Sequence, residues 1–237
     1  MAIPRVHSLK LSPDDSRLVS VVQTLNPDGK SYGTALWAIP LGGEPYRLTR
    51  SAKGETAAEF TGTGDLLFTS SRPDPTVKDA DEEVAALWLL PAGGGEARRI
   101  AARPGGVGAF RTAGDTVVFA SDVLDGEEAD EAERRKARKD AGISAILHEG
   151  YPVRYWDHDL GPGRTRLFAG RLGPDGLEDV RDLTPRPGRG AARRRLHAHP
   201  RRPHGDLHLA DPAVPRRAAR RAGRDRRGVR GAAHARQ

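Results

Sequence analysis

The chain has 237 residues, 37% of them hydrophobic, with 39 Lys and Arg against 32 Asp and Glu and a formal net charge of +7. It contains no cysteine, which excludes disulfides, thiolate zinc sites and thiol catalysis. No apolar run is long enough for a signal peptide at the amino terminus or for a membrane span of roughly 18 residues, so we expect a soluble cytoplasmic protein with no membrane partner.

Three segments about fifty residues apart share one pattern, in which an apolar residue enters a polar turn that is followed by an apolar strand. They are Leu11–Val19, Phe60–Phe68 and Phe110–Phe119. Gly, Asp and Pro supply the turn dihedrals, and the β-branched or aromatic residues that follow favour a strand. Each segment therefore predicts a β-hairpin.

A second repeated element lies between the hairpins. The segments Ala35–Pro40 and Ala86–Pro91 each contain a tryptophan, and each is followed by a glycine-rich turn and a short strand. The two elements together predict four short antiparallel strands per repeat, which is the composition of a propeller blade. A β-sandwich with regular turns is the alternative interpretation.

We therefore expect an all-β fold, a partial β-propeller of about three four-stranded blades within residues 1–185. The predicted blades cover residues 5–50, 55–103 and 107–184.

The third repeat is interrupted by a charged segment, residues 126–141. Acidic residues precede basic residues in it, an order that suits the helix dipole and spaced ion pairs. We expect a solvated helix of about 14 residues, in a surface insertion rather than a partner-binding element. The segments Arg166–Gly170 and Glu178–Thr184 are the strand candidates that complete the third blade.

The run Tyr155–Asp159 holds the residues most suggestive of chemistry, Asp157, His158 and Asp159. Such residues can ligate a metal or act as a base and its orienting group. Successive residues of a strand point to opposite faces, so on a strand His158 would face away from the two carboxylates. We therefore expect a structural role for this run.

Sequence motifs for catalysis or cofactor binding are absent. No serine lies in a G-x-S-x-G elbow, and the glycine-rich segments 93–95 and 105–106 lack the ending of a phosphate loop. We assign no catalytic residue, no cofactor-binding residue and no metal ligand, and we expect no cofactor.

The last 52 residues, 186–237, differ from the rest. They contain 16 Arg and three Asp but no Lys, Glu, Ser or Thr, whereas residues 1–185 hold 23 basic and 29 acidic residues. The sequence pI of about 10.1 is therefore set by this tail, and the acidic body argues against a specific nucleic-acid partner. Such a composition is typical of a GC-rich gene read out of frame. We expect the frame to be lost between Thr184 and Gly190 and the tail to be disordered or partly helical.

The opening Leu11–Asp15, the two Ala-Leu-Trp segments at 35 and 86, and the run Val153–Gly161 resemble the amino-terminal propeller of prolyl-oligopeptidase-type serine peptidases, in particular the acylaminoacyl-peptidase-like branch. The resemblance covers about residues 5–184. It implies a propeller that limits the access of peptide substrates to a catalytic α/β-hydrolase domain. No such domain follows here, so no catalytic position is carried over and activity of this chain alone is not expected.

Two functions follow from these observations. The first is a non-catalytic, truncated and frameshifted propeller fragment of a peptidase that cleaves short peptides, of acylaminoacyl, dipeptidyl or oligopeptidase type. The alternative is a small β-domain whose basic tail binds nucleic acid or an acidic partner, with steeply salt-dependent and sequence-blind affinity. Three blades cannot close a ring, so we also expect both terminal blade faces to be open and the chain to be prone to aggregation.

Overall fold

The computed structural model describes residues 3–76, 84–126, 129–148, 153–155, 158–185, 195–198 and 207–210. For Tyr155, His158, Asp159 and the last two ranges it describes the backbone alone. No helix in this part of the chain is long and apolar enough to cross a membrane.

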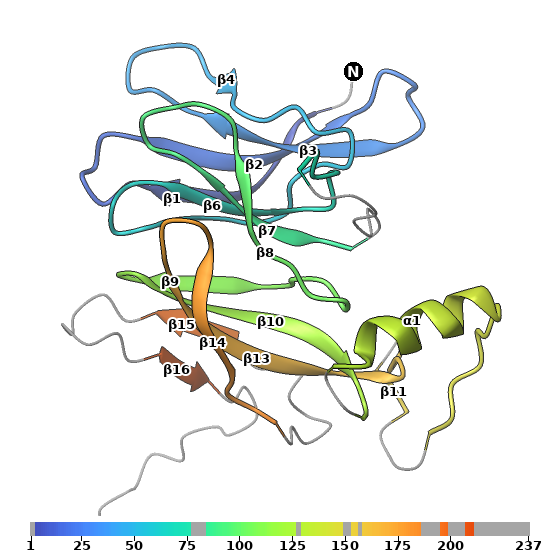
Figure 1. Cartoon of the computed structure of the whole chain (residues 1–237). Coiled ribbons are helices and arrows are strands. Elements are labelled where there is room, and N and C mark those ends of the chain that lie inside the picture. Colours follow the sequence, from blue (N-terminus) through green and yellow to red (C-terminus); the bar gives the residue numbers. More distant parts are fainter. Residues whose placement is uncertain are drawn as a thin grey trace, which may run out of the picture.

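The described residues form three four-stranded antiparallel sheets, which we call blades 1, 2 and 3 (Figure 1). Each blade has a sequential strand order, and further elements lie between the second and third strands of blade 3. Blade 1 consists of β1 (Arg5–Leu11), β2 (Leu18–Leu25), β3 (Tyr32–Ala38) and β4 (Tyr46–Arg47). Blade 2 consists of β5 (Ala58–Phe60), β6 (Leu66–Ser70), β7 (Ala86–Leu90) and β8 (Arg98–Ala101). Blade 3 consists of β9 (Phe110–Ala113), β10 (Thr116–Leu124), β13 (Gly163–Leu172) and β14 (Leu177–Asp182).

The turn before the second strand of every blade needs a residue in the left-handed region of backbone conformation. Asp15, Gly64 and Gly114 hold these positions, with φ of 59°, 83° and 61°. Glycine adopts this region without steric cost, and aspartate is among the few other residues that tolerate it. The polar turns therefore produce the hairpins as the sequence predicts, and the all-β, partial-propeller fold is confirmed.

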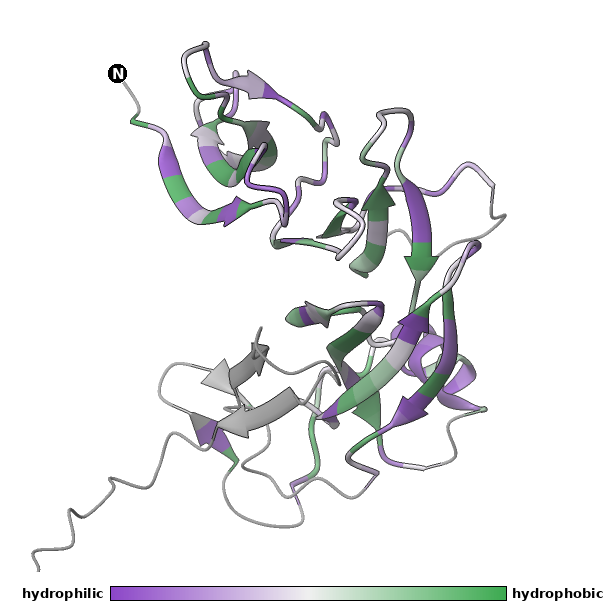
Figure 2. Ribbon diagram, turned by 90° about the vertical axis from the view of Figure 1, so that its left-hand side faces the viewer, coloured by the Kyte–Doolittle hydropathy of each residue, from purple (hydrophilic) through white to green (hydrophobic). Residues whose placement is uncertain are grey.

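Neighbouring blades adjoin one another at their first strands. β1 lies beside β5, and β5 lies beside β9. Seen from the side, the three sheets follow one another along an arc (Figure 2). This arrangement, with the first strand of each sheet toward the centre, is that of propeller blades.

Two apolar cores hold neighbouring blades together. Val19, Val21 and Leu36 of blade 1 pack with Phe68 and Trp88 of blade 2. A second core joins blades 2 and 3, and its members include Leu67, Leu87, Leu89, Val107, Phe110, Phe119 and Phe168. In that core the rings of Phe119 and Phe168 stack with centroids 5.6 Å apart. Because the strands alternate, blade 2 contributes one face to each core.

Polar contacts also connect the blades. Glu59 on β5 pairs with Lys10 on β1 (2.7 Å) and with Arg111 on β9 (3.1 Å), so one carboxylate joins the inner strands of three blades. The Thr112 hydroxyl donates a hydrogen bond to the Phe60 carbonyl oxygen (2.9 Å).

The insertion in blade 3 contains the expected helix, α1 (Glu131–Asp140), which is shorter than predicted. Its acidic first turn and basic last turn follow the predicted order. The side chain of Glu131, however, is buried: its Oε1 accepts hydrogen bonds from the Leu124 backbone N–H (3.2 Å) and from Arg135 Nε (3.0 Å). Arg135 also donates to the Asp122 carbonyl oxygen (2.8 Å). The helix is therefore anchored to the end of β10, although most of its residues are exposed.

Part of the tail also forms strands. β15 (Arg195–Ala198) and β16 (Leu207–Ala210) pair antiparallel, and β15 lies beside β9. The sequence analysis does not predict this pair. The rest of the tail, which we expect to be disordered or partly helical, lies outside the described residues.

Candidate functional site

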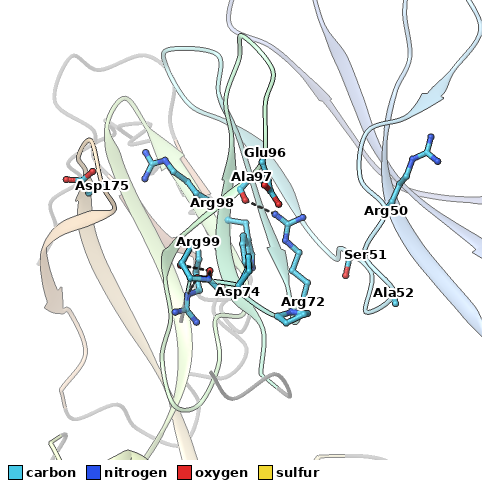
Figure 3. Close-up of a pocket in the computed structure, with 14 residues that line it drawn as sticks. Arg50, Ser51, Ala52, Arg72, Asp74, Glu96, Ala97, Arg98, Arg99 and Asp175 are labelled. Carbon is cyan, nitrogen blue, oxygen red and sulfur yellow. Dashed lines mark hydrogen bonds and ion pairs between the residues drawn. The ribbon is translucent and has the colours of Figure 1, made fainter. Parts of the chain in front are cut away.

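A pocket of about 730 Å³ lies beside blade 2 (Figure 3). Its walls come from three connections: the segment Arg50–Ala52 after blade 1, the segment Arg72–Thr76 after β6, and the segment Glu96–Arg99 leading into β8. Trp88 on β7 also lines the pocket, and Asp175, from the turn between β13 and β14, lines it on the side of blade 3.

Arg72 is the most firmly held cation of the pocket. Its guanidinium lies 4.1 Å from the centroid of the Trp88 ring and 5.3 Å from that of Phe68, and its Nη2 donates to the Ala97 carbonyl oxygen (3.0 Å). Burial lowers the pKa of Arg72, and the negative charge of Glu55 opposes that shift. These contacts hold the guanidinium against the Trp88 ring.

Asp74 and Arg99 form an ion pair at one wall, with Arg99 Nε 2.9 Å from Asp74 Oδ2. The Thr76 hydroxyl and backbone N–H donate to Asp74 Oδ1 at 2.6 and 3.0 Å. The hydrogen bond from the Thr76 side chain is the main reason that the pKa of Asp74 lies below its ordinary value. Asp74 is therefore charged at neutral pH and holds Arg99 in place.

Arg50 and Arg98 differ from Arg99 because no ion pair joins either of them to another described residue. Figure 3 shows them on different walls, with Arg98 on the side of Asp175. The lining contains four guanidinium groups and three carboxylates, those of Asp74, Glu96 and Asp175. Such a set can hold an anionic group through charge-assisted hydrogen bonds. Among the described residues, no group of three His, Asp or Glu could hold a metal ion.

A buried carboxylate lies close to the pocket. Glu55 has no solvent exposure, and its Oε2 accepts a hydrogen bond from the Thr49 hydroxyl (2.7 Å). Its Oε1 has no hydrogen-bond partner in the described part of the chain. Burial raises the pKa of Glu55, and the Thr49 hydrogen bond and the charge of Arg72 oppose the rise.

The structural role expected for the run Tyr155–Asp159 stays a prediction. Its residues form a separate antiparallel pair of β11 (Arg154–Tyr155) and β12 (His158–Asp159), with Tyr155 opposite His158. The alternation argument for the side chains of His158 and Asp159 therefore does not apply. Trp156 and Asp157 lie outside the described residues.

The glycine-rich segments adopt turns. Gly94, Gly95 and Gly106 have φ of 88°, 107° and 78°. The sequence reasoning missed every charged residue of the pocket, because Arg72 and Asp74 come from a connection without periodicity. The position of Glu55 carries one signal in the sequence: Glu55 follows Gly54, as Val107 follows Gly106 in the next blade.

The three sheets with adjoining first strands define the described part of the chain as a partial β-propeller. No family model matches the chain, and no curated protein matches it.

Solved structures do match it. An uncomplexed acylaminoacyl peptidase from Pyrococcus horikoshii is 9% identical, with a TM-score of 0.51. An acylaminoacyl peptidase in complex with Z-Gly-Gly-Phe-chloromethyl ketone is also 9% identical, with a TM-score of 0.52. Each match covers 76% of this chain and 25% of the peptidase chain, so the matched part spans about a quarter of those proteins. The chain therefore has the fold found in part of these peptidases.

Proposed function

We propose that residues 3–185 are the non-catalytic propeller part of a serine peptidase of acylaminoacyl, dipeptidyl or oligopeptidase type. In this proposal the propeller limits which peptides reach a catalytic domain, and the protein acts in the cytoplasm. The observation that carries it is the adjacency of β1, β5 and β9, in a fold shared with two acylaminoacyl peptidase structures over 76% of the chain.

The ion pairs of Glu59 support a filtering role. The carboxylate joins Lys10 and Arg111, so charged groups occupy the first strands of all three blades. In a completed propeller the first strands lie around the central channel. The side chains of Lys10 and Arg111 are 31% and 39% exposed, which leaves them able to contact a passing peptide.

The proposal includes a lost reading frame and the truncation that results from it. The Arg-rich composition after Pro185 supports this part, and it can be tested separately from the fold. The parent protein would continue with further blades and with the hydrolase domain.

Peptide hydrolysis by a frame-restored protein tests the proposal. The gene is repaired by one base within the codons for residues 185–190, and both proteins are assayed on N-acetyl-alanine p-nitroanilide and on a 30-residue peptide. We expect the repaired protein to cleave the short substrate and to spare the long peptide, while the chain of 237 residues cleaves neither. A repaired protein without hydrolase activity, or one that cleaves both substrates equally well, contradicts the proposal.

The basic-tail alternative makes a different prediction. A nucleic-acid-binding arm with 16 Arg would bind DNA of any sequence, and its affinity would fall steeply between 50 and 200 mM salt on the order of 10³-fold or more. Fluorescence anisotropy with a labelled duplex, using the full chain and a chain ending at Pro185, separates the two functions. Tail-dependent binding whose affinity falls steeply over this salt range would favour the arm.

A further inference from the structure

The pocket beside blade 2 has two sides, which the pairing of β7 with β8 separates. Trp88 on β7 pairs with Arg99 on β8, and the next pair is Leu89 with Arg98. Directly paired residues lie on the same face of a sheet. Trp88 belongs to the core with blade 1, whereas Leu89 belongs to the core with blade 3. Arg99 therefore lies on the side of blade 1 and Arg98 on the side of blade 3.

The side of blade 1 has an excess of positive charge. Its lining contains the guanidinium groups of Arg50, Arg72 and Arg99 and the carboxylates of Asp74 and Glu96 (Figure 3). Three positive and two negative side chains leave a net charge of +1 on this side. The ion pair between Asp74 and Arg99 is internal to the wall, so the excess falls on the remaining arginines.

Arg72 has N–H donors that the described residues do not use. A guanidinium group carries five such donors, and the one acceptor that the described residues offer to Arg72 is the Ala97 carbonyl oxygen. The side chain is partly buried, but its Nε and Nη1 are not among the buried nitrogens that lack a partner. Both nitrogens are therefore accessible to solvent. A partly buried cation has lost part of its hydration, and a bound anion replaces it.

The other walls of the pocket are largely apolar. They are formed by Ala52, Pro73, Pro75 and Ala97. Each proline fixes its backbone φ, which stiffens the connection that follows β6. The volume of about 730 Å³ lies within the range of roughly 300–1,000 Å³ that is typical of small-molecule sites. These walls suit an organic ligand that combines an apolar body with one anionic group.

We propose that this pocket binds a small organic carboxylate, whose carboxylate group is held by Arg72. A carboxylate carries a single negative charge, which balances the net charge of +1. Its two oxygens match the parallel N–H groups of a guanidinium fork. Arg50, on the opposite wall (Figure 3), adds its charge to the potential in the pocket. The ligand is either a free organic acid or the carboxyl end of a short peptide, since both present the same group.

The inference does not depend on the peptidase proposal, because every residue of the pocket belongs to the chain of 237 residues. Its test is the melting temperature of the full chain, followed by circular dichroism at constant ionic strength. A ligand that binds only the folded chain raises this temperature in proportion to its affinity and concentration. The probes are N-acetyl-leucine, its uncharged amide, the peptide acetyl-Ala-Ala-Leu with a free carboxyl end, and inorganic phosphate, each up to about 50 mM.

Two pairs of variants isolate the pocket from the basic tail, which is the same in all of them. Arg72→Gln removes the proposed carboxylate partner, and Arg181→Gln is its control, because Arg181 is exposed on β14 and does not line the pocket. Ala52→Glu places a negative charge at an exposed position of the lining, and Ala52→Gln places a neutral side chain of the same shape there. The Ala52 pair decides the test if Arg72→Gln does not fold.

We expect N-acetyl-leucine to raise the melting temperature of the wild type, Arg181→Gln and Ala52→Gln, and its amide to have no effect. Arg72→Gln and Ala52→Glu should each weaken the binding of N-acetyl-leucine about tenfold or more. Equal stabilisation by the peptide assigns the site to the carboxyl end of peptides, and stabilisation by N-acetyl-leucine alone assigns it to free acids. The proposal is overturned if the acid does not stabilise the chain, if the amide acts equally well, or if phosphate binds more tightly. Binding that Ala52→Glu or a folded Arg72→Gln leaves unchanged also overturns it.

Discussion

Glu55 and Val107 occupy the same position in successive blades. Each follows a glycine in the left-handed region, Gly54 with φ of 77° and Gly106 with φ of 78°. The backbone N–H of Glu55 donates to the Thr34 carbonyl oxygen (3.3 Å), and that of Val107 donates to the Ala85 carbonyl oxygen (2.6 Å). Both side chains are buried. One repeat thus places a carboxylate where the next places a valine.

Replacement of Glu55 by the residue of the next blade should stabilise the protein. We expect Glu55→Val to raise the free energy of unfolding by about 1 kcal/mol at pH 7, since an apolar side chain removes the cost of burying a charge. The reverse exchange, Val107→Glu, should cost roughly 3–5 kcal/mol. Urea denaturation measures both. Equal destabilisation by the two variants would contradict the equivalence of these sites.

Glu55 should also make stability depend on pH. Its folded pKa is raised by burial, so the folded state holds this proton more tightly than the unfolded state does. The associated stabilisation is complete below the unfolded pKa of about 4.3. It is lost as the pH rises through the folded pKa. Glu55→Gln cannot titrate, so its stability relative to the wild type should increase from pH 4 to pH 8. A difference that stays constant over this range, or that decreases, would show that the carboxyl is not perturbed in this direction.

Arg17 of blade 1 contacts three residues of blade 2. Its guanidinium lies 5.2 Å from the Phe60 ring centroid and donates to the carbonyl oxygens of Gly64 and Ala92. We expect Arg17→Ala to destabilise the protein by about 1 kcal/mol, and a double-mutant cycle with Phe60→Leu to give a coupling of about 0.5–1 kcal/mol. Arg50→Ala, at an exposed arginine without an ion pair in the described residues, is the control. A coupling near zero would rule out the stacking contact.

We expect the ion pairs of Glu59 to stabilise the protein, and we expect salt to weaken this stabilisation. Because Lys10 and Arg111 are both about a third exposed, screening by water limits the expected loss in Glu59→Gln to about 0.5–1 kcal/mol. The loss should shrink in 1 M NaCl, where the Debye length is about 3 Å. Glu44→Gln, at an exposed position, should be neutral under both conditions. A loss of stability in Glu59→Gln that does not depend on salt would indicate that Glu59 acts through packing instead.

The repeat explains why much of the fold could be predicted. Turn residues such as Gly64 and Gly114 require specific backbone dihedrals, and the strands beside them alternate, so local chemistry determines each hairpin. The pairing of blades by their first strands follows from the same repeat. The hairpin of β15 and β16 was not predicted, because the composition of the tail indicates a lost reading frame.

The pocket could not be predicted, for a physical reason. Arg72 acquires its place by stacking on Trp88, and Asp74 by accepting hydrogen bonds from Thr76. These contacts arise where connections of irregular length meet a neighbouring sheet, and no sequence period encodes them. The burial of Glu131 at the start of α1 is a similar case: the charge order predicts the helix, but not that its first carboxylate anchors it to β10.

The central claim, a peptidase propeller that has lost its reading frame, is tested most directly by the nucleotide sequence downstream of the codon for Thr184. Read in the other two frames, it should continue in one of them with blade repeats about fifty residues apart and then reach a G-x-S-x-G elbow of a hydrolase domain. Early stop codons in both frames, or an open frame without repeats or elbow, would contradict the account.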